Sequence, residues 1–96
     1  NPFKSIHAAA LVNLGEFTGG LLVVQWCKDN DMKGIVSEII TKFHKKARGK
    51  IRADSSIEFE STALQDNPEV KQISLLYNES EELVTTVTVT WSLKPV

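Results

Sequence analysis

The sequence predicts an α+β domain in which one long central helix is wrapped by a curved antiparallel β-sheet. Residues 6–27 are apolar on nearly every helical face, and a helix that is apolar all round is normally buried. From residue 35 onward the chain is rich in β-branched and aromatic residues that alternate with polar ones, which is typical of strands. Hairpin-like connections between these strands favour antiparallel pairing. A helix of this kind requires a sheet that curves around it.

The composition is that of an ordinary globular chain. Its 96 residues are the size of one domain, so we interpret residues 1–96 as a single domain. The formal net charge of −1 provides no global basic field that would attract nucleic acid or an anionic membrane. The single cysteine, Cys27, leaves no partner for an internal disulfide and fits a reducing compartment. We therefore expect an intracellular, cytoplasmic protein.

The helix is predicted to run from about Ile6 or His7 to about Trp26. Ser5 is a suitable N-cap, because its hydroxyl can accept a hydrogen bond from a free N–H of the first turn. Each glycine within a helix costs up to about 1 kcal/mol relative to alanine. Three glycines here therefore indicate close approach of another element: Gly15, Gly19 and Gly20.

We do not expect the apolar run to cross a membrane, although it is long enough. It contains Glu16 near its centre, and a carboxylate in lipid would be expensive and rare. It also lacks the basic region that precedes the apolar stretch of a signal peptide. The chain starts at Asn1 and runs almost directly into the helix, so we expect further residues before it.

Four strands are predicted after a polar connection at residues 28–34. The last of them has the clearest alternation of polar and apolar residues in the chain. A turn around residues 47–49, a turn-rich tract and a hairpin loop separate the strands. The four ranges are 35–45, 50–60, 70–77 and 82–93.

Glu16 is the strongest candidate for a functional residue. It is the only charged residue between His7 and Lys28. Burial of a carboxylate without a partner costs roughly several kcal/mol, so such a residue has either a hydrogen-bonded structural role or a chemical one. His7 lies nine residues before Glu16, and Asn1 lies six residues before His7. This spacing favours the chemical role.

The segment NPFKSIHAAALVNLGE, from Asn1 to Glu16, resembles the signature of the hotdog-fold acyl-CoA thioesterase superfamily, and within it the phenylacetyl-CoA thioesterase type. In that family an asparagine is followed six residues later by a His-Gly-Gly turn that opens the central helix, and an acidic residue lies nine residues after the histidine. Residues 39–50 resemble the family's second strand and the turn after it. The chain is most similar to an uncharacterised thioesterase-like branch in which His-Ala replaces His-Gly. The resemblance implies a hotdog fold, with the family's first strand missing before Asn1.

The resemblance also implies hydrolysis of acyl-CoA thioesters and assigns roles by position. The backbone N–H of Ala8 matches the amide at the helix N-terminus that polarises the thioester carbonyl. Glu16 matches the carboxylate that activates water as general base or attacks the carbonyl itself. Asn1 matches a residue that orients the water or the thioester, and His7 is expected to shape the turn. Coenzyme A enters only as part of the substrate, and no separate cofactor is expected.

The spacing of Ala8 and Glu16 favours a site made by two chains. The two residues lie about 12 Å apart along one helix, which is too far for both to act on one carbonyl. In the family, Glu16 of one subunit would face the Ala8 turn of another, so we expect a homodimer or a dimer of dimers. The chain departs from the family where His-Ala-Ala replaces His-Gly-Gly and Glu replaces the commoner Asp. These departures bear on activity more than on the fold.

The basic tract at residues 42–50 has two interpretations. Lys45, Lys46 and Arg48 could bind the phosphates of coenzyme A, or the tract could be a solvated strand end. No metal site is expected, because His7 and His44 fall on different elements without the spacing of metal ligands. Nucleic-acid binding lacks a platform of basic and aromatic residues.

Two other functions remain open at this stage. A hotdog dehydratase acting on 3-hydroxyacyl thioesters would pair a histidine with an acid, but that family spaces them differently. A non-catalytic hotdog module could instead bind acyl thioesters or serve as an assembly subunit. Glu16→Gln distinguishes an enzyme from the non-catalytic module, because an enzyme would lose turnover and stay folded while a structural module would lose stability or assembly.

Overall fold

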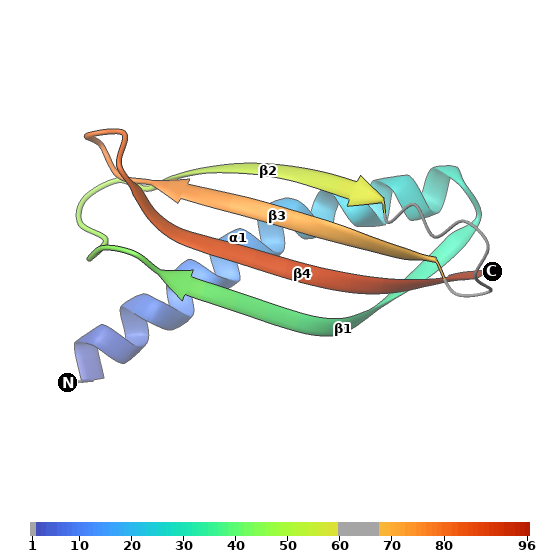
Figure 1. Ribbon diagram of the computed structural model, residues 1–96, viewed down its shortest axis with the longest axis horizontal. Coiled ribbons are helices and arrows are strands. Elements are labelled where there is room, and N and C mark those ends of the chain that lie inside the picture. The colour runs from blue at the N-terminus through green and yellow to red at the C-terminus, as the bar shows by residue number, and fades with distance from the viewer. Residues whose placement is uncertain (1, 60–67) are drawn as a thin grey trace.

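One helix packs across one face of a four-stranded sheet (Figure 1). A computed structural model describes the backbone of residues 2–59 and 68–96, and the side chains of residues 10–59 and 68–96. This arrangement confirms the predicted fold class, and the sheet is the one that a hotdog fold requires. In chain order the elements are α1 (Pro2–Asp29), β1 (Met32–Phe43), β2 (Arg52–Phe59), β3 (Glu69–Tyr77) and β4 (Leu83–Pro95).

The strands are ordered β1-β4-β3-β2, and every neighbouring pair is antiparallel. Only β3 and β4 form a tight hairpin in the described chain. β1 and β2 follow each other in sequence but lie at opposite edges, so residues 44–51 cross from one edge of the sheet to the other. The pairing of β1 with β4 shifts between Val36 and Glu38, and that of β3 with β4 shifts between Leu76 and Tyr77. Such irregularities bend the strands and increase their twist.

The core lies between one stripe of α1 and the inner face of the sheet. On the sheet, large side chains of β3 and β4 are fully buried, among them Leu76, Val87, Val89 and Leu93. Because a helix turns once in about 3.6 residues, every fourth residue of α1 falls on the same side. The buried residues of the helix follow this spacing: Leu11, Gly15, Gly19, Val23 and Cys27.

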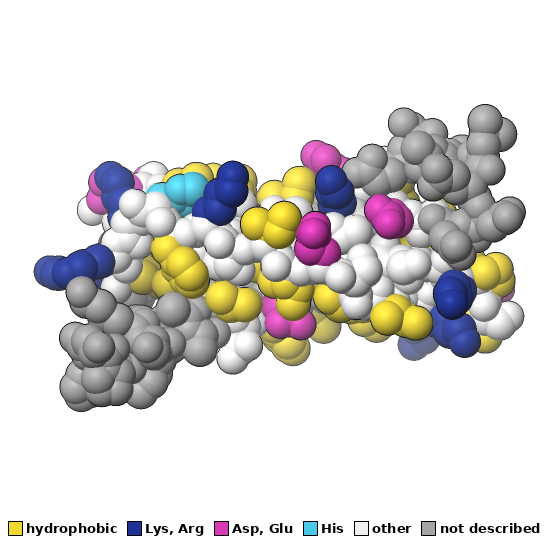
Figure 2. Space-filling view, turned by 60° about the horizontal axis from the view of Figure 1, so that its bottom comes forward, with side chains coloured by type: hydrophobic (Ala, Val, Ile, Leu, Met, Phe, Trp, Pro, Cys, Tyr) yellow, Lys and Arg dark blue, Asp and Glu magenta, His cyan; other side chains and the backbone are white. Residues whose placement is uncertain are grey.

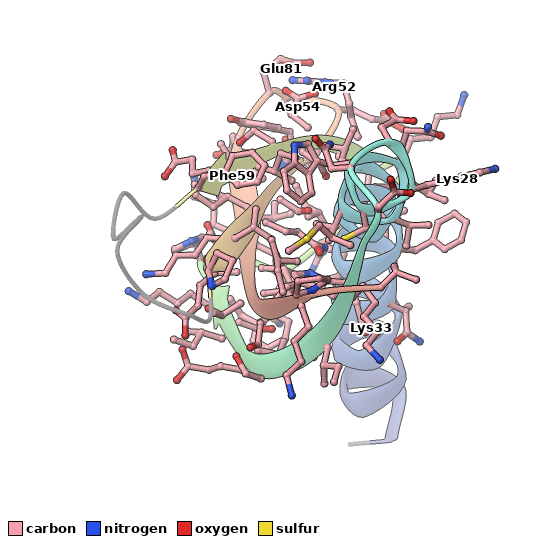
Figure 3. All side chains as sticks on the ribbon, turned by 90° about the vertical axis from the view of Figure 1, so that its right-hand side faces the viewer. Lys28, Lys33, Arg52, Asp54, Phe59 and Glu81 are labelled. Atoms are coloured by element: carbon pink, nitrogen blue, oxygen red, sulfur yellow. The ribbon has the colours of Figure 1, made fainter. Side chains whose placement is uncertain are left out.

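The opposite side of α1 is apolar and exposed to solvent. Phe17 is 67% exposed, Val24 57% and Leu21 55%. The expectation of a helix buried on all sides is therefore wrong, because four strands cover only one of its faces; seen along the long axis, the sheet curls round one side of α1 and leaves the other free (Figure 3). Large exposed apolar areas commonly mark sites of interaction.

Exposed apolar residues also occur along β1, at one edge of the sheet. Figure 2, which views the molecule from the side turned toward the reader, shows hydrophobic side chains spread along its length, with charged side chains between and beyond them. The residues of β1 that contribute are Ile35, Ile39, Ile40 and Phe43. Edge strands with unpaired backbone groups and apolar side chains are natural places for association with another chain.

The helix begins earlier than the sequence predicts. α1 starts at Pro2, so Ser5 lies within the helix and the predicted N-cap there is wrong. Proline is favoured at the first helical position, because its fixed φ suits the helix and its missing N–H would have no partner there. The end of the helix is close to the prediction: the backbone N–H of Asn30 donates to the carbonyl of Trp26, and Asp31 takes a positive φ of 54° in the turn to β1.

One stretch of the described helix, Ala10–Asp29, is long and apolar enough to cross a membrane, with a mean hydropathy of 1.2. Length and composition alone are weak evidence, because the core helix of a globular protein meets the same conditions. Here one side of the stretch packs on the sheet, and Glu16 lies within it. A membrane span is not established by this helix.

The glycines of α1 differ in what surrounds them. A Cβ atom built on Gly19 would lie 2.4 Å from Cγ of Gln72, and one on Gly15 would lie 2.7 Å from a methyl group of Val87. At Gly20 the nearest atom is a ring carbon of Trp91 at 3.9 Å, an ordinary contact. The predicted close approach of another element is confirmed at Gly15 and Gly19 and is wrong at Gly20.

Replacement of Thr85 by valine is expected to raise the free energy of unfolding by about 1 kcal/mol. The Thr85 hydroxyl is fully buried and has no hydrogen-bond partner among the residues that the structure describes. A buried hydroxyl without a partner carries an uncompensated desolvation cost, which a methyl group of similar size removes. Urea denaturation of the two proteins measures the difference.

The neighbouring Thr86 provides the control for this prediction. Its hydroxyl lies 2.9 Å from Nε2 of His44 and is only half-buried. Thr86→Val therefore loses a hydrogen bond and gains no relief from desolvation, so it should not stabilise the protein. An equal gain in both variants would show that β-propensity, not the unpaired hydroxyl, is responsible.

Candidate active site

A shallow apolar groove of about 480 Å³ runs along the exposed side of α1. Its floor and walls come from two elements: α1, and the aromatic side chain of Trp91 from β4. A single carboxylate, Glu16, and a single amide, Asn13, are the polar side chains of the lining. The remaining lining residues are Phe17, Gly20, Leu21 and Val24.

A second hollow of about 300 Å³ continues toward the C-terminal end of the helix. It shares Val24 and Trp91 with the first groove, so the two form one depression along the helix. Lys28 and Lys33 border it, and the Lys28 side chain projects away from the sheet into solvent (Figure 3). The depression is thus apolar along its length, with a carboxylate toward one end and lysines at the other.

The Glu16 carboxylate has no hydrogen-bond or ion-pair partner within the described part of the chain, and the residue is half-buried. An unpaired carboxylate beside an apolar groove is placed where it could act on a substrate bound in that groove. Its neighbour in the groove, Asn13, lies three residues earlier, on the same side of the helix.

The backbone beneath Glu16 is held by side chains of the sheet. Gln72 Nε2 donates to the carbonyl of Glu16 at 2.9 Å and to that of Gly15 at 3.2 Å. Ser74 Oγ donates to the Gly15 carbonyl at 2.7 Å and lies 2.7 Å from Oγ of Ser55. These hydrogen bonds join α1 to the sheet at Gly15 and Glu16, and only Gln72 reaches Glu16.

Reasoning from sequence missed three residues near Glu16. Asn13 could have been found from the spacing of three residues along the helix. Trp91 and Gln72 lie in the last two strands, and their approach to Glu16 depends on the strand register and on the packing of α1. No local pattern in the sequence carries that information.

Of the other residues expected at the N-terminal end of the site, the structure describes only the backbone of His7 and Ala8. Asn1 lies outside the described residues, as does the side chain of His7. Ala8 lies inside α1, which starts at Pro2. A backbone N–H in that position normally bonds to the carbonyl four residues earlier. Service as an oxyanion donor would require the turns before Ala8 to leave the helix.

The basic residues expected to bind phosphate lie at the opposite end of the sheet from Lys28, near the β3–β4 hairpin. Lys45 forms an ion pair with Glu82. This contact, followed by a hydrogen bond from Asn78, lowers the pKa of the Glu82 carboxyl. Lys46 and Arg48 are exposed in the connection between β1 and β2.

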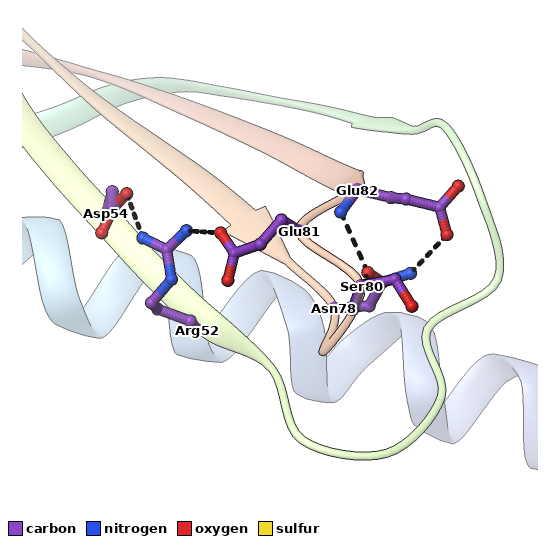
Figure 4. Close-up of polar contacts among 6 residues, drawn as sticks. All are labelled: Arg52, Asp54, Asn78, Ser80, Glu81 and Glu82. Carbon is purple, nitrogen blue, oxygen red and sulfur yellow. Dashed lines mark hydrogen bonds and ion pairs between the residues drawn. The ribbon is translucent and has the colours of Figure 1, made fainter.

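The acidic loop between β3 and β4 forms ion pairs with neighbouring elements and hydrogen bonds within itself. Arg52 pairs with Asp54 and Glu81, as Figure 4 shows. Within the loop, Asn78 Oδ1 accepts hydrogen bonds from the backbone N–H groups of Ser80 and Glu82. Glu82 of this loop also pairs with Lys45, so one lysine of the expected phosphate site already has a carboxylate partner.

Cys27 is buried beside this region. Burial raises the pKa of the Cys27 thiol, so it stays protonated at neutral pH. Among the described residues, no group of three or more histidine, cysteine, aspartate or glutamate side chains could hold a metal ion.

Solved structures resemble this one in fold. The BH2602 protein from Bacillus halodurans, crystallised with CoA, superposes with a TM-score of 0.73 and 19% sequence identity, over 91% of this chain and 54% of that one. A variant of the thioesterase SAV0944 from Staphylococcus aureus gives a TM-score of 0.73 and 20% identity, over 93% of this chain and 70% of that one. The chain thus spans about half the length of BH2602. The likeness confirms the hotdog fold.

Sequence comparisons place the chain in a family. No curated protein sequence matches it. Residues 1–93 match the family described as a domain of unknown function, DUF4442. Because this match covers nearly the whole chain, the protein belongs to the DUF4442 family, with the hotdog fold of thioesterases.

Proposed function

We propose that the chain hydrolyses acyl-CoA thioesters, with Glu16 as the catalytic carboxylate and the apolar groove as the site of the acyl group. The observation that carries the proposal is a half-buried carboxylate without a partner, beside an apolar groove, in the described part of a hotdog fold. Two proteins of similar fold support it, because one is a thioesterase and the other was crystallised with CoA. An acyl-CoA substrate would place the reaction inside the cell.

In this proposal Glu16 accepts a proton from a water molecule as the water oxygen attacks the thioester carbonyl carbon. The carbon–sulfur bond then breaks, and the CoA sulfur leaves and takes up a proton. The products are a carboxylic acid and free CoA thiol. Direct attack by the carboxylate, with an anhydride intermediate that water then cleaves, is the other route open to the same residue.

A homodimer, or a dimer of dimers, completes the proposed site. The side of α1 that bears the groove is open in one chain, and exposed apolar residues continue along β1. A second chain that covers them would exclude water from the groove and strengthen electrostatic contacts inside it. In such a dimer Asn1, His7 and the Ala8 amide of one subunit would meet Glu16 of the other, with residues 45–48 or the lysines near the helix end available to the phosphates.

A non-catalytic module that binds acyl thioesters is the alternative, and one observation favours it. The Ala8 N–H lies inside the helix that starts at Pro2, so it is not free to stabilise an oxyanion in this conformation. A module of this kind would keep the groove and its affinity for acyl chains but would not need a free donor at that position.

The experiment that tests the proposal is thiol release from short, medium, long and aromatic acyl-CoAs by the wild type and by Glu16→Gln. We expect the variant to lose about a hundredfold in kcat, a typical size for loss of a general base, while circular dichroism and size-exclusion chromatography stay unchanged. Glutamine keeps the size of the side chain and removes its basicity.

Binding is measured from the fluorescence of Trp91 in two matched proteins, Trp26→Phe and Trp26→Phe with Glu16→Gln, in which Trp91 is the remaining tryptophan. Hydrolysis that persists in Glu16→Gln would overturn the role of this residue. No thiol release from any substrate, with Trp91 fluorescence still responding to acyl-CoA, would replace the enzyme by the binding module.

A further inference from the structure

Gln72 has an unusual environment for a polar residue in the middle of a sheet. Its side chain is fully buried, and every polar group of its amide has a partner. The two N–H groups of Nε2 face the carbonyls of Glu16 and Gly15, and Oε1 accepts a hydrogen bond from Trp91 Nε1 at 2.7 Å. Because an indole N–H can only donate, this last bond fixes which end of the amide faces the helix.

The space for the Gln72 side chain depends on a glycine, Gly19, in the interior of α1. The amide lies so close to α1 that a Cβ atom on Gly19 would be 2.5 Å from Nε2. Glycine weakens a helix interior, and a buried amide is unfavourable unless all its hydrogen bonds are made. An apolar side chain at position 72 with alanine at position 19 would be the simpler core. The actual pair brings a donor to the Glu16 backbone.

We propose that Gln72 is a positioning residue for Glu16, a role that rests on the proposed function of that carboxylate. Gln72 joins the backbone of Glu16 on one side of the groove to Trp91 on the other. The link sets the rotation and the axial position of this turn of α1 relative to the groove wall. A displacement of about 1 Å at a reacting group can cost about a hundredfold in rate.

Ser74 provides a matched control on the same strand. Its hydroxyl is also fully buried and donates to the Gly15 carbonyl at 2.7 Å, but it makes no hydrogen bond to Glu16 or Trp91. Ser74→Ala therefore removes the hydrogen bonds of this hydroxyl to Gly15 and to Ser55 and leaves the link across the groove in place. A role in stability alone predicts similar behaviour of the two positions.

The test compares kcat and KM for thioester hydrolysis in Gln72→Met, Ser74→Ala, Glu16→Gln and the double variant with Gln72→Met and Glu16→Gln. Methionine keeps the length of the side chain and removes its donors. We expect Gln72→Met to lower kcat by about tenfold or more with little change in KM. Ser74→Ala should stay within about twofold of the wild type in kcat. In the Glu16→Gln background, Gln72→Met should cause no further loss, because it acts through the missing carboxylate.

Trp91→Phe replaces Gln72→Met in this comparison if Gln72→Met does not fold. It removes the N–H that orients the Gln72 amide and keeps an aromatic wall, so kcat should fall in the same direction by a smaller factor, about threefold. Equal kcat values for the Gln72 or Trp91 variants and Ser74→Ala would overturn the positioning role, as would a further tenfold loss in the Glu16→Gln background. Undiminished hydrolysis by Glu16→Gln alone would overturn the proposed function itself, and the positioning role with it.

Discussion

Gly19→Ala is expected to lower the free energy of unfolding by about 3 kcal/mol. The added methyl group would lie 2.4 Å from Cγ, 2.5 Å from Nε2 and 2.7 Å from Cδ of Gln72. Either α1 must rise from the sheet or Gln72 must leave its position and lose its hydrogen bonds to Glu16, Gly15 and Trp91. Overpacking of a core costs about 1–3 kcal/mol, and each lost buried hydrogen bond about 1 kcal/mol more. These costs exceed the gain of up to about 1 kcal/mol in helix propensity.

Gly20 is the matched control, because it is the next residue of the same helix. A Cβ atom there makes only an ordinary contact with Trp91. Gly20→Ala should therefore raise the free energy of unfolding by about 0.5 kcal/mol or more through helix propensity alone. Urea denaturation at fixed protein concentration measures both variants. Two changes of the same sign would contradict the packing described for α1 on β3.

Leu76→Ala is expected to lower the free energy of unfolding by about 3–4 kcal/mol. Leu76 is fully buried, and its Cδ1 atom lies 3.4 Å from the position that a Cβ atom on Gly15 would take. Glycine at that position offers no side chain of its own to fill the space left by the leucine. Removal of a buried leucine side chain costs about 2–5 kcal/mol, with the larger values where the cavity cannot collapse.

The adjacent Leu75 tests whether the sheet has the expected orientation. Leu75 points to the other face of β3 and is only half-buried. Leu75→Ala should cost about 1 kcal/mol, in proportion to the smaller apolar area that it covers. A thermal or urea unfolding curve for each variant gives the comparison. A larger loss of stability in Leu75→Ala than in Leu76→Ala would contradict the packing of α1 on the face of the sheet that carries Leu76.

Periodicity predicts the elements well because it reflects local geometry. The helix, and each of the four strands, lies within a few residues of its predicted range. Strand order is not local: β2 follows β1 in sequence yet pairs with β3 at the far edge. An alternating pattern shows that a strand has two faces but does not identify its neighbours.

The apolar composition of α1 misled the prediction of its burial. A helix that is apolar all round can be buried by its own chain or covered by another one, and the sequence does not distinguish these cases. The structure shows that Phe17, Leu21 and Val24 face outward. These apolar side chains therefore line the groove and do not contribute to the core between α1 and the sheet.

The candidate site was predictable only where its residues lie close together in sequence. Glu16 is conspicuous as a lone charge in an apolar run, and Asn13 lies one turn before it. Gln72 and Trp91 reach the same place from β3 and β4, whose register puts them on the inner face of the sheet. Their roles depend on contacts between elements far apart in the chain.

The pairing of β1 with β4 also has a consequence for synthesis on the ribosome. β1 is made early but pairs along its whole length with β4, the final strand in chain order. Until β4 emerges, the apolar residues of β1 and one side of α1 have no partner within the sheet. Contacts of such long sequence separation slow folding, and they leave aggregation-prone apolar surface exposed until they form. Nascent chains that stop before β4 should therefore be substrates for chaperones and proteases.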